Sequence, residues 1–303
     1  MTAQVPFVDA HIHLWDLAHI RYSWLTGPFT NDGPNGSVEA IAIDYGVEAY
    51  RADLERWNVV GAVHVDAGAD AVHALDESRW LEEVAAKHGL PTGLVAFAAL
   101  DAPDVADLLA AQAEHPRVRG IRHIVNWHPD PSRTYGPRDL TQDAQWQAGY
   151  GKLAKHGLSF DLQCYPGQMP GLVPLIERHP DVPVIINHLG MPVLTDADGV
   201  AEWRDGLARL AAFSHVSIKL SGLGFIRRDW SVETIRSFVL EAIDLFGTDH
   251  CMVASDAPTD KLFAPLDTYL EAYHAIVADF SEDDRRDLFA RNANRIYRLG
   301  LDI

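Results

Sequence analysis

The sequence predicts an α/β fold in which residues 1–303 form a single domain, a (β/α)₈ TIM barrel with long strand-to-helix loops. Three observations lead to this prediction: the chain length, a regular alternation of apolar runs with helical segments, and unequal connections between them. The chain has 303 residues, and one barrel with its loops typically needs about 250 residues.

Eight short runs rich in apolar and β-branched residues recur along the chain, with helical segments between them. They cover residues 7–14, 59–67, 94–100, 118–125, 158–164, 182–188, 216–220 and 251–255. Runs of this kind are typical of strands in a parallel sheet that is buried on both faces.

Hydrophobic period and end signals predict a helix after each of these strands. The expected helices cover residues 47–57, 76–88, 105–115, 144–156, 171–179, 202–213, 232–246 and 266–278. Ser231 and Ser281 stand where they would cap helices, and the second begins a final helix through Asn292. The tetrad Lys-His-Gly-Leu occurs at 87–90 and 155–158, and we expect its glycine to end a helix in the left-handed conformation.

The connections are short from helix to strand and long from strand to helix, as at 15–44, 126–141 and 189–200. In a barrel the long connections gather at the C-terminal face of the strands, where active sites of this fold lie. Residues 27–36 are rich in Gly, Pro and Asn, and we interpret them as a lid within the first long loop.

Composition limits the possible classes of function and indicates the cellular compartment. Lys and Arg number 25 against 43 Asp and Glu, a net charge of −18. This argues against nucleic-acid and anionic-membrane partners, and a small-molecule substrate is expected. Cys164 and Cys251 cannot form a disulfide framework, and residues 1–7 show no leader signal. A cytoplasmic protein is expected, either a monomer or a homodimer.

The strongest chemical signal is His11 and His13, which end the first expected strand. Side chains two apart on a strand point to the same face, here the barrel interior. Two such imidazoles can bind one divalent ion or hold one polar substrate. The alternative is a pair of hydrogen-bonded structural histidines.

Two further strand ends carry groups suited to the same pocket. His188 ends a very apolar strand immediately before Leu-Gly, and Asp256 follows the last strand. A carboxylate there is costly to bury unless it is paired or used in chemistry, so Asp256 is a candidate general base. Its alternative role is to cap the turn at Ala257 and Pro258.

Other strand ends and the first loop supply candidate substrate contacts, each with barrel or local packing as its alternative. They are Arg122, His123, Gln163, Lys219, Trp24 and Tyr22. Arg122 is suited to a carboxylate, and a Lys such as Lys219 is unusual in so apolar a strand. Polar groups at many strand ends together indicate a pocket.

With these residues in place, the sequence resembles the amidohydrolase superfamily, and within it the lactonases of sugar lactones and of 2-pyrone-4,6-dicarboxylate. The resembling stretches are 8–15, 24–25, 119–123, 156–161, 188–192, 219–223, 254–258 and 292–297. The resemblance implies a barrel that hydrolyses a lactone, with His11, His13, His188 and Asp256 at the metal site and Asp256 also activating water. Some members bind one divalent ion, commonly zinc, and others work without metal.

The expected function is therefore the opening of a sugar lactone or a carboxylated lactone by water that Asp256 activates. His188, a metal held by His11 and His13, or Lys219 with Arg122 would stabilise the oxyanion. One alternative is a metal-dependent decarboxylase of an aromatic or dienoic acid on the same fold. A more distant alternative is a barrel that only binds a small acid.

Overall fold

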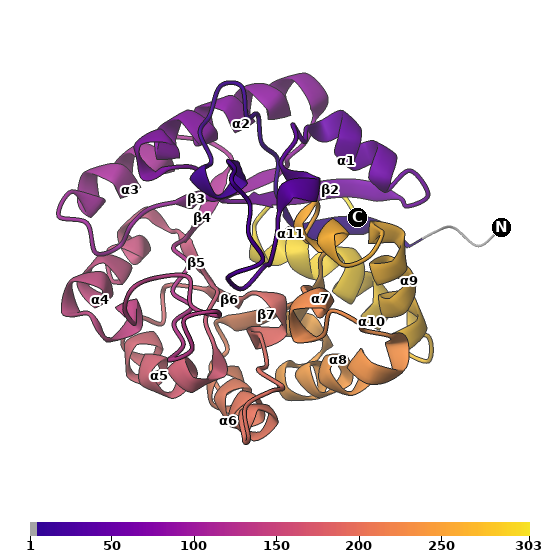
Figure 1. Cartoon of the computed structure of the whole chain (residues 1–303). Helices are drawn as coiled ribbons and strands as arrows, with labels where there is room; N and C mark the ends of the chain where they lie inside the picture. Colours follow the sequence, from indigo (N-terminus) through magenta and orange to yellow (C-terminus); the bar gives the residue numbers. More distant parts are fainter. Residues whose placement is uncertain (1–4) are drawn as a thin grey trace.

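The computed structural model describes residues 5–303 and consists of eight parallel strands that alternate with helices around a central barrel (Figure 1). The strands are β1 Phe7–Ile12, β2 Val59–Val65, β3 Gly93–Phe97, β4 Val118–Arg122, β5 Ser159–Leu162, β6 Val184–Ile186, β7 Val216–Leu220 and β8 Cys251–Val253. The prediction that residues 1–7 carry no leader signal falls partly on residues 1–4, which lie outside the described residues. No helix among residues 5–303 is both long and apolar enough to cross a membrane.

Each strand pairs in parallel with the next along the chain, in the order β1 to β8. The seam between β1 and the chain after β8 is closed by a parallel bridge between Ile12 and Ala257. Across this seam the His13 amide donates to the Ala257 carbonyl at 2.6 Å, and the Asp256 amide donates to the His11 carbonyl at 3.0 Å. The predicted (β/α)₈ barrel is confirmed, and its seam brings the two ends of the sheet together.

The helices occur where the sequence predicts them, with differences at several ends. They are α1 Val47–Asp53, α2 Ala74–His88, α3 Val105–Ala113, α4 Ala144–Tyr150, α5 Met169–Arg178, α6 Gly199–Ala211, α7 Leu223–Ile226, α8 Val232–Phe246, α9 Leu266–Ile276, α10 Glu282–Arg286 and α11 Asn292–Ile296. The short α7 was not predicted. The helix expected at 144–156 divides into α4 and a 3₁₀ turn at Leu153–His156. The final helix runs on past Asn292, because a π-helical segment at Asp287–Arg291 joins α10 to α11.

The predicted end signals have the expected geometry. Gly89 and Gly157 follow their helical segments with φ of +76° and +62°, the left-handed region that favours glycine. The Ser281 hydroxyl accepts a hydrogen bond from the Asp284 amide at 3.0 Å and caps α10. At α8 the Ser231 amide donates to the Thr234 hydroxyl at 2.9 Å.

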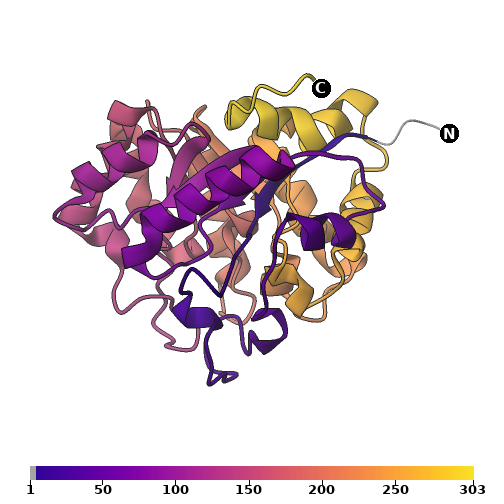
Figure 2. The same cartoon turned by 90° about the horizontal axis from the view of Figure 1, so that it is seen from above.

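Two packed layers hold the barrel. The helices pack around the outside of the strands, while small and branched side chains such as Val8, Val63 and Ile185 fill the inside. Tyr297, which follows α11, packs with the side chains that fill the barrel, and Phe289 of the C-terminal helical segment packs against Phe7 of β1. Figure 2 shows this segment on the side opposite the long first loop. The long loops are therefore left free to form the other end.

Candidate active site

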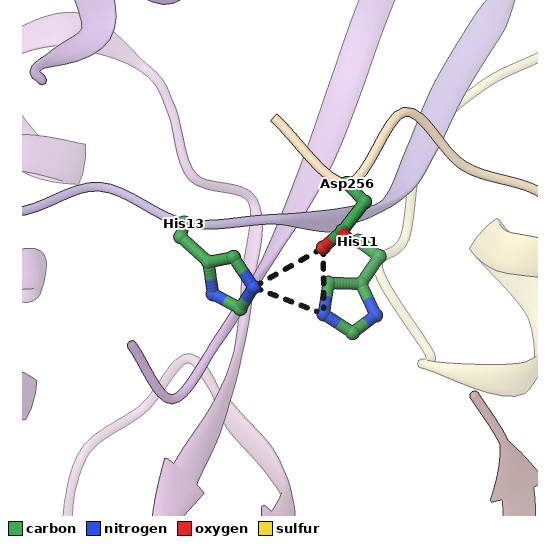
Figure 3. Close-up of side chains that lie close together, drawn as sticks. All are labelled: His11, His13 and Asp256. Atoms are coloured by element: carbon green, nitrogen blue, oxygen red, sulfur yellow. Dashed lines mark hydrogen bonds and ion pairs between the residues drawn. The ribbon is translucent and has the colours of Figure 1, made fainter. Parts of the chain in front are cut away.

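His11, His13 and Asp256 meet at the C-terminal end of the barrel seam (Figure 3). The Nε2 atoms of His11 and His13 lie 3.3 Å apart. The Oδ1 atom of Asp256 lies 3.3 Å from His13 Nε2 and 3.6 Å from His11 Nε2. The exposed fractions of these residues are 0%, 6% and 1%. Three polar side chains from the first and last strands of the sheet thus lie together in a site that is almost fully shielded from solvent.

The backbone that presents these groups is unusual at two of the strand ends. Asp256 and His188 have φ of +53° and +52°, in the left-handed region that residues other than glycine rarely adopt. Such a conformation costs on the order of 1 kcal/mol or more for each residue and is concentrated at functional sites. The sharp turns point both side chains back toward the barrel axis.

His188 lies beside the three-residue group without joining it. Its ring centroid is 4.7 Å from that of His11, and its Nδ1 atom is 4.0 Å from Asp256 Oδ2. The same Nδ1 is within 3.1 Å of the Ser221 hydroxyl, at the end of β7. His188 is therefore placed to contact a bound molecule next to the carboxylate.

Burial keeps the His11 and His188 imidazoles neutral at neutral pH, and the Asp256 carboxylate is ionised. Burial lowers the pKa of His11 well below 6.5, and the nearby Lys219 charge adds to this. Burial also lowers the pKa of His188 to about 4, against the opposing effect of Asp256. Burial alone would raise the pKa of Asp256, but His188, His13 and Arg122 hold it below its ordinary 3.8. Asp256 is thus a base at neutral pH.

The three-residue group has the composition and spacing of a metal site. One ligand atom from each of His11, His13 and Asp256 lies within 4.8 Å of the others. Ligands of a tetrahedral zinc ion at its usual bond lengths stand about 3.4 Å apart, close to the separations found here. Neither carboxylate oxygen of Asp256 accepts a hydrogen bond within the described part of the chain. These three residues fit a divalent cation, while the metal-ligand role predicted for His188 stays a prediction.

A pocket of about 580 Å³ opens above this group. Its floor includes His13, His188 and Asp256, and much of one wall comes from residues 28–36 of the first long loop. Aromatic rings of Trp24, Phe29, Tyr135 and Phe225 line it as well. The size and mixed lining suit a small organic molecule.

Arg122 and Gln163 line the pocket, and a hydrogen bond between them holds both side chains in position. The Arg122 Nε donates to Asp66 Oδ2 at 3.3 Å, and its Nη1 donates to Gln163 Oε1 at 3.0 Å. A third N–H donates to the Asp66 carbonyl. A guanidinium has five N–H donors, so two remain for an oxygen of a bound molecule.

Three of the expected substrate contacts lie outside this pocket lining. The Tyr22 hydroxyl is buried and donates to Glu77 Oε1 at 3.0 Å. His123 points to the opposite face of its strand from Arg122, where its Nδ1 accepts from the Leu100 amide at 3.1 Å. Lys219 is enclosed in the barrel, with its Nζ 2.5 Å from Asp161 Oδ1.

Several lining residues were not singled out in the sequence. Phe225 lies on the unpredicted α7, Asn35 lies in the first long loop, and Thr259 begins a 3₁₀ helix at Thr259–Leu262. Their only signal is membership of a strand-to-helix connection, which does not fix the direction of a side chain. Tyr135, a loop aromatic that the sequence did offer as a possible pocket residue, lines the pocket, and its hydroxyl donates to Asn35 Oδ1 at 2.8 Å.

Comparison with known proteins gives a family match over nearly the whole chain. The sequence model of the family described as Amidohydrolase matches residues 8–299. The uncharacterized protein y4mH of Sinorhizobium fredii is 39% identical over 301 residues, covering 98% of this chain and all of the relative.

Two further relatives carry more specific descriptions. An L-fucono-1,5-lactonase of Burkholderia ambifaria is 25% identical over 303 residues, covering 96% of this chain and 95% of the relative. A crystal structure of an amidohydrolase from Burkholderia multivorans with bound zinc superimposes with a TM-score of 0.79 at 26% identity. That superposition covers 96% of this chain and 99% of the other.

Proposed function

Because the chain belongs to the amidohydrolase family, we propose that it is an enzyme that hydrolyses a small, uncharged lactone. The observation that carries the proposal is the Asp256 carboxylate. It is buried, accepts no hydrogen bond from the described residues, and faces a pocket that also contains the Arg122 guanidinium. A base and an oxyanion donor at one cavity are what water attack on an ester carbonyl requires.

The mechanism follows from these groups. Asp256 takes a proton from a water molecule while the oxygen of that water attacks the lactone carbonyl carbon. The two remaining N–H groups of Arg122 and the His188 imidazole, both in the pocket lining, would stabilise the negative charge that develops on the carbonyl oxygen. When the ring C–O bond breaks, the protonated Asp256 returns the proton to the leaving oxygen, and a hydroxy acid is released.

A divalent cation, zinc in the first instance, would be held by His11, His13 and Asp256, and when bound it supplies Lewis-acid polarisation. The zinc in the Burkholderia multivorans structure supports this assignment. His13 is suited to the role because its Nδ1 is within 2.7 Å of the Val65 carbonyl, which leaves Nε2 free for the cation.

The charge of the pocket favours an uncharged lactone over a carboxylated one. Arg122 is the one Lys or Arg among the described lining residues, and Asp66 already pairs with it. Asp32 and Asp256 add two carboxylates to the lining. The proposed cation would offset these two charges, so the lining offers no surplus positive charge to hold extra carboxylates, whereas hydroxyl groups find acceptors and donors there. The name of the Burkholderia ambifaria relative, a sugar lactonase, supports the same class.

A lactone panel tests the proposal. Neutral aldono-lactones and dicarboxylated lactones are offered to the purified protein, and acid release is followed with a pH indicator. We expect neutral lactones to be hydrolysed with kcat/KM at or above about 10⁴ M⁻¹ s⁻¹, the ordinary range for enzymes. Preferential opening of dicarboxylated lactones would contradict the substrate class, and carbon dioxide release from aromatic acids would favour the decarboxylase alternative.

The role of Asp256 is tested by Asp256→Asn, which keeps the shape and removes the base. We expect kcat to fall by about 10³-fold, within the range that general bases contribute, while the unfolding temperature is retained. The control is Asp104→Asn, since Asp104 is exposed, precedes α3 and does not line the pocket. Wild-type turnover by Asp256→Asn would exclude the proposed base.

A further inference from the structure

Gln163 directly follows β5 and lies at the C-terminal mouth of the barrel. It comes two residues after Asp161, so strand alternation points both side chains to the same face. Asp161 is 0% exposed inside the barrel, whereas Gln163 is 4% exposed and lines the pocket. The Gln163 carbonyl accepts a hydrogen bond from the Val125 amide at 3.2 Å, which holds its backbone in place. The side chain is therefore fixed at the pocket wall and almost shielded from solvent.

The orientation of the Gln163 amide is settled by its neighbour. Arg122 Nη1 lies 3.0 Å from Gln163 Oε1. A guanidinium has N–H donors and no acceptor, so the amide turns its oxygen toward Arg122 and its NH₂ group away from it. Within residues 5–303 no group accepts a hydrogen bond from Gln163 Nε2. A buried NH₂ group without an acceptor in the protein, at the wall of a pocket, points to a partner that a bound molecule supplies.

The hydrogen-bond donors at this wall of the pocket lie side by side. Two N–H groups of Arg122 remain after its bonds to Asp66 and Gln163. The oxygen and nitrogen of an amide share one carbon atom, so the Gln163 NH₂ group lies next to the guanidinium that its oxygen contacts. Two neighbouring donors suit two neighbouring oxygens of one substrate. In a lactone, the neighbour of the carbonyl oxygen is either the ring oxygen or an oxygen on the carbon next to the carbonyl.

We propose that Gln163 is a specificity-determining residue whose NH₂ group donates to an oxygen on the carbon next to the lactone carbonyl, while Arg122 binds the carbonyl oxygen. The enzyme thereby selects lactones of 2-hydroxy acids. The ring oxygen is left to face Asp256, which returns a proton to it when the ring opens. This inference rests on the lactone hydrolysis proposed above and names the substrate oxygen that the pocket recognises.

A cycle of one variant and two substrates tests the contact. Gln163→Met keeps the length of the side chain and removes both ends of its amide, and each protein is assayed with an aldono-lactone and with its 2-deoxy form. We expect Gln163→Met to reduce kcat/KM about tenfold more with the 2-hydroxy lactone than with the 2-deoxy lactone, near the upper end for one neutral hydrogen bond. An equal loss with both substrates would mean that Gln163 only orients Arg122, and it would refute the proposal.

Gln163→Glu supplies a second variant, because it keeps the acceptor for Arg122 and replaces the NH₂ group by another acceptor. A 2-hydroxyl group can turn its hydrogen toward that oxygen, whereas a 2-fluoro substituent has no hydrogen to donate. We expect the kcat/KM preference for the 2-hydroxy lactone over the 2-fluoro lactone to be about tenfold larger in Gln163→Glu than in wild type. An unchanged preference would contradict donation by Gln163, even if Gln163→Met does not fold.

Gln145→Met is the matched control, because Gln145 is exposed on α4 and does not line the pocket. We expect wild-type kcat/KM from this variant with each of the three lactones.

Binding of lactams, in which a ring N–H replaces the ring oxygen, separates this inference from the proposed reaction. Calorimetry compares the 2-hydroxy lactam with the 2-deoxy lactam, and we expect wild type to bind the first about tenfold more tightly. Equal affinities, or no binding of either lactam, would overturn the inference even if lactones are hydrolysed. A clear preference for the 2-hydroxy lactam without turnover of any lactone would support the contact and reject the reaction.

Discussion

Arg122 connects the pocket to the carboxylates around it. Its guanidinium is 4% exposed and is anchored by Asp66 and Gln163, and it also lowers the pKa of Asp256. The planar guanidinium makes these hydrogen bonds and still has two N–H groups to offer. A Lys at this position would keep the positive charge but could not make the same set of hydrogen bonds.

We therefore expect Arg122→Lys to reduce kcat/KM by about 10²-fold, the usual loss of an oxyanion donor, with a much smaller change in unfolding temperature. Steady-state kinetics on the best lactone of the panel measures this. Arg209→Lys serves as the control, since Arg209 pairs with Asp205 on the exposed face of α6. A rate for Arg122→Lys within threefold of wild type would remove Arg122 from the mechanism.

Glu77 gives the protein a pH-dependent stability. Burial, together with the nearby Asp66 charge, raises the pKa of this α2 residue from 4.5 to about 8. The folded chain thus holds the proton more tightly than the unfolded chain does. The stability that this proton contributes is complete below pH 4.5 and is lost as the pH rises through 8.

Glu77→Gln imitates the protonated form, and its amide oxygen can still accept from Tyr22. We expect its unfolding temperature to match wild type near pH 5 and to exceed it by about 2 °C or more near pH 9. Differential scanning fluorimetry across this range measures the difference. An exposed control, Glu114→Gln, should show no such trend, and a Glu77→Gln benefit largest at low pH would refute the assignment.

Side-chain direction separates what the sequence predicts from what it does not. Strand alternation correctly indicates that His11 and His13 share a face, and the same rule separates Arg122 from His123 once the strand is known. Tyr22 lies in an irregular loop, where no period relates neighbouring side chains. Lys219 lies inside the barrel because Asp161 compensates its charge there, and no local pattern reveals a partner on another strand.

Helix α4 packs closely against the backbone after β3. A Cβ at Gly149 would lie 2.0 Å from the Leu100 carbonyl oxygen, so only glycine lets the two backbones approach. The periodic pattern of 144–156 carries no trace of Leu100, so the sequence does not predict this contact.

Gly149→Ala should consequently lower the free energy of unfolding by about 2 kcal/mol, within the usual cost of overpacking. Urea denaturation followed by circular dichroism measures it. Gly167→Ala is the matched control, since a Cβ at Gly167 would meet no atom within 4 Å. Equal stability of Gly149→Ala and wild type would show that the backbones can separate at little cost.

The first long loop is held over the pocket by the bond between the Tyr135 hydroxyl and Asn35. Loss of one neutral hydrogen bond weakens an arrangement by about 0.5–1.5 kcal/mol. We expect Tyr135→Phe to raise KM roughly three- to tenfold and to change kcat less, as measured by steady-state kinetics. Tyr45→Phe removes a hydroxyl bound to Asp53 outside the pocket lining and should leave KM unchanged. An unaltered KM in Tyr135→Phe would mean that this bond does not shape the pocket.

The whole chain carries a net charge of −18. Repulsion among the excess negative groups destabilises the folded state. Salt screens this repulsion, because the Debye length falls to about 10 Å near 0.1 M. We expect the unfolding temperature to rise by a few degrees between about 0.02 and 0.2 M sodium chloride, and potassium chloride to act equally. A fall would show that the ion pairs on the surface outweigh the repulsion.

The barrel seam has a consequence for synthesis on the ribosome. His11 and His13 emerge early, whereas Asp256 follows the last strand and reaches them only when that strand docks against the first. A nascent or prematurely released chain therefore carries the two imidazoles without the carboxylate. The proposed base joins the two imidazoles last, so we expect hydrolytic activity only once the ring of strands is complete.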